Sequence, residues 1–66
     1  MEDIDIWRTA TLLMRMYGEG ATFNAAQRAD ALLEQGDGTG WVIWVSVMHA
    51  IEQLEAQKER EGKALN

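Results

Sequence analysis

His49 is the only histidine in this chain of 66 residues and the side chain best suited to acid–base chemistry. Ser46 lies three positions before it and Glu52 three positions after it, so the residue types of a hydrolytic triad occur together. On a helix, this spacing makes the three side chains point outward from one cylinder, without a cleft or an oxyanion hole. A catalytic histidine needs a nucleophile and a carboxylate held around it by the fold. We therefore expect His49 to belong to a surface or an interface, and the protein not to be an enzyme.

The glycine-rich segment 36–40 resembles the centre of a calcium-binding loop. Such a loop needs an acidic residue at its first position and a bidentate glutamate at its twelfth. With Gly38 on the glycine of that pattern, Leu33 and Trp44 take those two positions. A phosphate-binding loop needs a lysine followed by serine or threonine, which is missing here, and Asp37 would repel a phosphate. We expect the segment to end one helix and begin the next.

The composition narrows the possible functions further. The chain has no cysteine and one histidine, which excludes disulfides and thiolate chemistry and predicts neither a metal site nor a cofactor. Eleven acidic residues against six basic ones give a net charge of −5, and the basic residues are scattered along the chain. Nucleic-acid affinity depends on clustered lysine and arginine, so we expect no nucleic-acid partner.

The N-terminal residues 1–5 are acidic and do not have the pattern of a signal peptide. No apolar run approaches the ~18 residues of a membrane span. We therefore expect a cytoplasmic protein without a membrane partner. A chain of this size buries only about 60% of the surface that its unfolded form exposes. Association with another chain is the remaining source of stability.

Two glycine clusters divide the chain, which has no proline, into helical pieces. They predict an all-α fold: a three-helix bundle, compact or opened into a hairpin, with helices over about 4–17, 21–35 and 39–61. The long third helix would be the spine of a single domain, 1–66, with a frayed tail at 62–66. The segment 41–54 is rich in β-branched residues, but its apolar spacing is helical and no second strand exists to pair with it.

A period of about 100° per residue assigns an inward face to each helix. The first face consists of Ile6, Trp7, Ala10, Leu13, Met14 and Tyr17. The second consists of Ala21, Ala25, Ala26, Ala29, Leu32 and Leu33. The third consists of Ile43, Trp44, Val47, Met48, Ala50, Ile51 and Leu54, with Trp41 at its edge.

Several large side chains fall outside these faces. Exposed apolar patches on small proteins usually mark interfaces. The candidate interface residues are Leu12, Met16, Phe23, Trp41, Val42, Val45 and His49. The alternative is that loose packing in so small a domain buries some of them internally.

A spread pattern covers most of the chain. It consists of Asp5-x-Trp7-Arg8-x-Ala10, Tyr17-Gly18, Ala25-Ala26-x-Arg28-Ala29-Asp30-x-Leu32-Leu33, Gly36-Asp37-x-x-Gly40, and Trp44 with Ala50-Ile51-Glu52-x-Leu54. This pattern resembles a family of short, uncharacterised bacterial helical proteins, a domain of unknown function. The resemblance implies a helical fold and no particular activity. Where the family leads us to expect charged residues, around Val45 and Ser46, this chain is not charged.

Two functions fit these observations. The first is a non-enzymatic protein–protein interaction module that self-associates through the third helix, as a two-fold homodimer. The alternative is a small acidic inhibitor or adaptor of the phage type, an anti-defence protein or nucleic-acid mimic that binds a basic protein. A helix-turn-helix DNA reader would also have three short helices, but the acidic charge argues against it.

Overall fold

A computed structural model describes residues 3–64 of the chain, and the side chains of residues 3–61. The elements in chain order are α1 (Asp3–Tyr17), the short 3₁₀ helix η1 (Gly18–Gly20), α2 (Ala21–Glu34) and α3 (Gly38–Ala64). No strand occurs between residues 3 and 64. The all-α class predicted from the sequence is confirmed.

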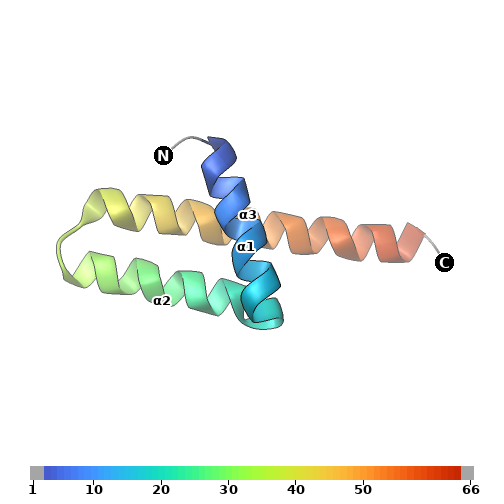
Figure 1. Cartoon of the computed structure of the whole chain (residues 1–66), viewed down its shortest axis with the longest axis horizontal. Coiled ribbons are helices and arrows are strands. Elements are labelled where there is room, and N and C mark those ends of the chain that lie inside the picture. The colour runs from blue at the N-terminus through green and yellow to red at the C-terminus, as the bar shows by residue number, and fades with distance from the viewer. Residues whose placement is uncertain (1–2, 65–66) are drawn as a thin grey trace.

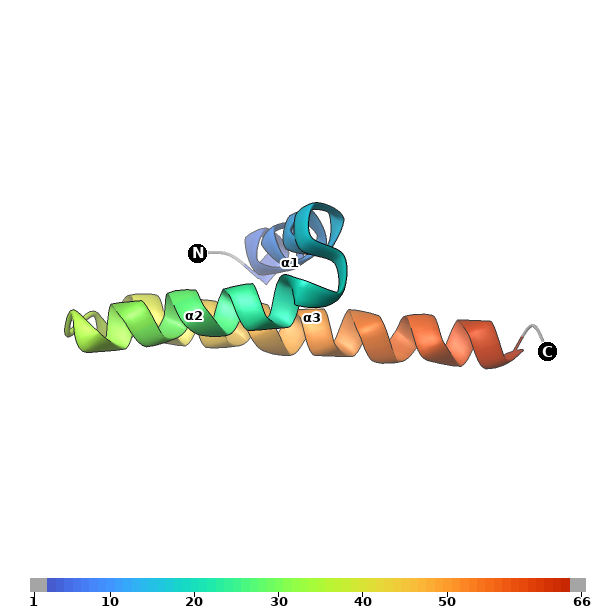
Figure 2. The same cartoon turned by 90° about the horizontal axis from the view of Figure 1, so that it is seen from below.

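The helices form a hairpin crossed by α1 rather than a bundle of three aligned helices. α2 and α3 lie side by side and run antiparallel, and α1 crosses one face of this pair steeply (Figures 1 and 2). α1, η1 and α2 follow one another without an irregular residue, so the chain is in effect one bent helical segment and one long helix. The connection is itself the helical turn η1, with Gly18 at φ 56°, and it redirects the chain so that α1 crosses α2 instead of lying alongside it (Figure 1). The compact form of the expected bundle is therefore corrected to this more open arrangement.

The core lies where the three helices meet and is built mainly from small side chains. Its buried residues are Ala10 and Leu13 from α1, Ala21, Ala25 and Ala29 from α2, and Val47, Ala50 and Ile51 from α3. Five of these eight residues are alanines, which let neighbouring helices approach closely. The alanine face predicted for the second helix is thus confirmed at Ala21, Ala25 and Ala29.

Residues 35–37 connect α2 to α3, and Asp37 forms hydrogen bonds with both helices. Gly36 adopts φ 81°, and the backbone N–H of Asp37 donates to the carbonyl of Leu32 (2.9 Å), which closes α2. The carboxylate of Asp37 then accepts a hydrogen bond from the backbone N–H of Gly40 (2.9 Å), which caps α3. The glycine-rich segment therefore serves as a helix stop and a helix start, as predicted.

α3 is longer than the sequence predicted. It continues to Ala64, three residues beyond the expected end at 61. Of the predicted frayed tail, residues 62–64 belong to the helix and residues 65 and 66 lie outside the described residues. Thr22 in the first turn of α2 lies level with Glu55, since its Oγ1 donates to Glu55 Oε1 (3.4 Å). Residues 56–64 therefore extend past the end of α2, and we call them the overhang (Figure 1).

Candidate functional site

The three residues that imitate a triad do not form one. The hydroxyl of Ser46 donates to the carbonyl of Val42 one turn earlier (2.9 Å), so it is engaged with its own helix. His49 is exposed and lines a shallow hollow of about 240 Å³. The other lining residues are Asp3, Ile6 and Trp7 of α1, with Ser46, Ala50 and Gln53 of α3. Ser46 therefore lines this hollow with its hydroxyl hydrogen-bonded to its own helix.

In the part of the chain that the structure describes, no group of three or more histidine, aspartate or glutamate side chains could hold a metal ion. No helix within the same residues is long and apolar enough to cross a membrane.

Most of the predicted interface residues are open to solvent. Leu12, Met16, Phe23 and Val42 expose 55%, 60%, 67% and 55% of their surface. His49 is exposed as well, whereas Trp41 and Val45 are half-buried. The four large apolar side chains therefore find no place in the core, and internal burial by loose packing does not account for them.

The structure distributes these residues over three separate places. Leu12 and Met16 lie one turn apart on the outer side of α1. Phe23 lies on the side of α2 opposite its buried alanines, and so faces away from α3. The remaining predicted residues, Trp41, Val42, Val45 and His49, occupy the first half of α3. Only this last group is large enough to form a continuous surface on one helix.

The apolar residues at the start of α3 are not used by the core. The half-buried side chains that pack against the core are Ile6, Met14, Trp44, Met48 and Leu54. Trp41 and Val45 are half-buried without belonging to that set. Together with exposed Val42, they form an apolar group at the start of α3 that lies outside the core cluster.

This surface continues along α3 in a regular pattern, which we call the free face: Val42, Val45, His49, Glu52 and Ala56. The residues follow one another at steps of three and four, so they lie along one side of the helix. That side points away from the buried Val47 and Ile51. Glu52 and Ala56 were not among the predicted interface residues, because only large off-face apolar side chains and the histidine were considered. Their heptad-like spacing was the signal that could have identified them.

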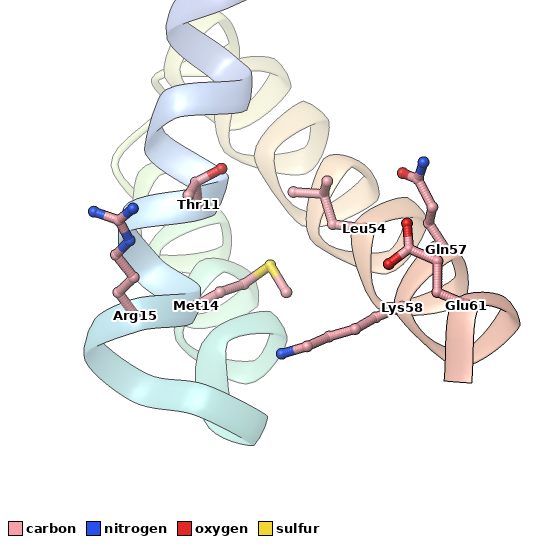
Figure 3. A pocket seen from close by; sticks show the side chains of 7 residues that line it. All are labelled: Thr11, Met14, Arg15, Leu54, Gln57, Lys58 and Glu61. Atoms are coloured by element: carbon pink, nitrogen blue, oxygen red, sulfur yellow. The ribbon is translucent and has the colours of Figure 1, made fainter. Parts of the chain in front are cut away.

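A groove between α1 and the overhang was also not predicted. It has a volume of about 510 Å³ and is lined by Thr11, Met14, Arg15, Leu54, Gln57, Lys58 and Glu61 (Figure 3). Met14 and Leu54 provide its apolar part, and the side chain of Lys58 extends from α3 toward the end of α1 (Figure 3). Arg15 points away from α3 (Figure 3). The groove therefore lacks the converging polar groups of a small-molecule site.

Three inward-facing predictions were wrong. Trp7, Tyr17 and Leu33 were expected to point into the core, but they are 40%, 41% and 54% exposed. Because α1 crosses the hairpin steeply, only part of its inward face reaches the other helices (Figure 2). These aromatic rings add to the apolar surface of α1 instead of to the core.

Comparisons of the chain with protein-family models, with curated proteins and with solved structures found no match, so the family resemblance stays a prediction.

Proposed function

We propose that the protein is a non-enzymatic interaction module that associates with a second copy of itself through the free face of α3. The observation that carries this proposal is Val42, which is 55% exposed beside Trp41 and Val45, while none of the three packs on the core. Apolar surface removed from water contributes about 25 cal/mol per Å². Covering these three residues is therefore the largest gain available to α3.

The shape of the molecule supports the same proposal. The described residues form a thin molecule, 16 Å in its shortest dimension, with α1 over one face of the α2–α3 pair (Figure 2). Domains of this size without disulfides or metals often gain stability by oligomerisation. A second copy placed on the free face in a two-fold arrangement would give α3 neighbours on every side. The bundle expected from the sequence would then be completed by association.

Replacing Val45 by glutamate tests the proposal. The new carboxylate would have to be buried in the contact, which is costly unless it is paired. We expect light scattering after size exclusion to give a dimer for the natural sequence and a monomer for Val45→Glu. Phe23→Glu is the matched control, since it adds the same charge on α2 and should leave the dimer intact. A dimeric Val45→Glu variant would show that the free face is not the contact.

A second candidate function rests on the outer side of α2. Asp30 and Glu34 are exposed there, on the same side as Phe23, which is 67% exposed. An acidic surface with one aromatic anchor suits a small inhibitor or adaptor that binds a basic protein. Such binding should weaken as salt rises and should be lost in Asp30→Lys with Glu34→Lys, but not in Val45→Glu. A complex that is insensitive to salt would contradict this function.

A further inference from the structure

We infer that the free face of α3 binds α3 of a second copy in antiparallel orientation, with the two long helices overlapping over nearly their whole length. In this arrangement, the overhang of each chain covers the apolar start of α3 in the other. The inference rests on the proposed self-association and adds its geometry: the contacting element, its direction and its register.

The spacing of the free face is the first argument. Residues 42, 45, 49, 52 and 56 advance by three, four, three and four, and residue 59 continues the series. Two α-helices pack along such a seam through its apolar positions, which here are Val42, Val45 and Ala56, while positions 49, 52 and 59 are polar. The buried residues of α3, Val47, Ala50 and Ile51, lie away from this seam, and α1 borders it at His49, beside the hollow that Ile6 and Trp7 also line. The seam is therefore open for another helix.

The two halves of α3 would each gain from a second helix, for different reasons. Its first half carries exposed Val42 and half-buried Trp41 and Val45, which lie outside the core cluster. Its last nine residues, 56–64, extend past α2, and most helical stability in proteins comes from the packing of one face against a neighbour. An antiparallel second copy satisfies both needs, because it lays the overhang of one chain along the apolar half of the other.

One register makes the free faces complementary. α3 runs from 38 to 64, so full overlap of two antiparallel copies places the two-fold axis near residue 51. In this register, each residue of the seam faces one residue of the second copy, and the two residue numbers add up to 101. Val45 faces Ala56 of the second copy, and the small alanine lets the helices approach. His49 faces Glu52 of the second copy, so that the imidazole N–H can donate to the carboxylate.

In the third pair of residues of this register, Val42 faces Glu59 of the second copy. The aliphatic part of a glutamate can cover the valine while its carboxylate stays in water. The charged neighbour of His49 from α1 is Asp3, which lines the same hollow. The histidine thus lies between an acidic residue of its own chain and one of the second copy.

The alternative orientations are less favourable. A parallel two-fold pair places each residue of the free face against its own copy, so Glu52 would face Glu52 and Glu59 would face Glu59. Like charges directly opposite each other are destabilising. An antiparallel pair centred on Val45 would leave both overhangs without a neighbour. Only the full overlap avoids both penalties.

Cysteine cross-linking tests the register, since the chain has no cysteine of its own. We expect the double variant Val45→Cys with Ala56→Cys to form a covalent dimer under mild oxidation. Val45→Cys alone should not, because the two copies of residue 45 would lie 11 positions apart along the seam, about 16 Å. Disulfides require Cα atoms within about 7 Å. The same separation prevents a disulfide between 45 and 56 within one chain.

Phe23→Cys places an exposed cysteine on α2 and measures the background of disulfides that form by random encounter. Light scattering of the natural sequence measures its mass in solution. The antiparallel pair is supported if the double variant forms a much larger fraction of covalent dimer than Phe23→Cys does. Val45→Cys alone should form no more covalent dimer than Phe23→Cys. Efficient cross-linking of Val45→Cys alone would overturn the register but keep self-association. A dimer by light scattering without cross-linking in any variant would overturn pairing through α3. A monomer at every concentration without cross-linking would overturn the proposed function as well.

Discussion

Replacing Asp37 by alanine should destabilise the hairpin that holds α3 in place. The carboxylate accepts a hydrogen bond from the Gly40 N–H at 2.9 Å, and loss of such a cap costs about 1 kcal/mol. The negative charge also lies at the positive end of the α3 dipole, which adds roughly 0.3–1 kcal/mol. We therefore expect a total loss of about 1–2 kcal/mol. In a domain of this size, about 1 kcal/mol shifts Tm by ~4–8 °C, so the variant should melt roughly 4–16 °C lower.

Asp37→Asn separates the two contributions. Asparagine is as good a cap as aspartate but carries no charge, so this variant should lose only the dipole contribution, about 0.3–1 kcal/mol. Asp30→Ala is the matched control, since it removes an exposed carboxylate from the middle of α2. It should leave Tm unchanged or raise it, because alanine is the better helix former.

Thermal unfolding followed by circular dichroism measures these differences. All variants must be compared at one protein concentration, because association raises apparent stability by mass action. Added salt should reduce the difference between Asp37→Asn and the natural sequence, since it screens the charge contribution. If Asp37→Ala melted within a degree or two of the natural sequence, the cap would contribute nothing. If Asp37→Asn were as unstable as Asp37→Ala, the charge and not the hydrogen bond would hold the turn.

Four further substitutions test the packing around α3 by the same thermal measurement. Val47→Ala removes fully buried methyl groups and should lower the free energy of unfolding by about 2–3 kcal/mol. Val42→Ala, at a position that is 55% exposed, should change it by less than about 0.5 kcal/mol in the monomer. Gly36→Ala forces a side chain into the left-handed conformation at φ 81° and should cost about 1–2 kcal/mol. Arg28→Ala removes a guanidinium that lies 5.0 Å from the centroid of the Trp44 ring, and should cost about 0.5–1 kcal/mol and change the tryptophan fluorescence. Equal losses for the two valine variants would mean that the assignment of buried and free faces on α3 is wrong.

Helical periodicity predicted which side of each segment would be buried, and it did so best for the regularly spaced alanines of α2. The alanines of α2 recur every four residues and could only form one inward stripe. Trp7 and Tyr17 were misplaced because periodicity gives the direction of a face but not the angle at which two helices cross. That angle depends on the three-residue turn at Gly18–Gly20, whose geometry the sequence pattern does not specify.

The candidate site was predictable in part for the same reason. The exposure of Leu12, Met16, Phe23 and Val42 follows from their positions off the inward faces. Their separation over three helices depends on how the helices are arranged, so composition and spacing alone did not show it. The end of α3 was placed too early because its last residues carry charges and no apolar stripe. Lysine, glutamate and arginine are nevertheless good helix formers, so the helix continues.

The overhang gives α3 two regions of different local stability within one helix. Up to Glu55, the backbone is supported by α2, and its amide hydrogens should exchange with solvent only when the hairpin itself opens. From residue 56 onward, the helix can fray without disturbing the core, so its amides should exchange much faster in the isolated chain. Antiparallel pairing would protect these same amides, and the protection would rise with protein concentration. The last two turns of α3 are thus a built-in reporter of association that needs no label.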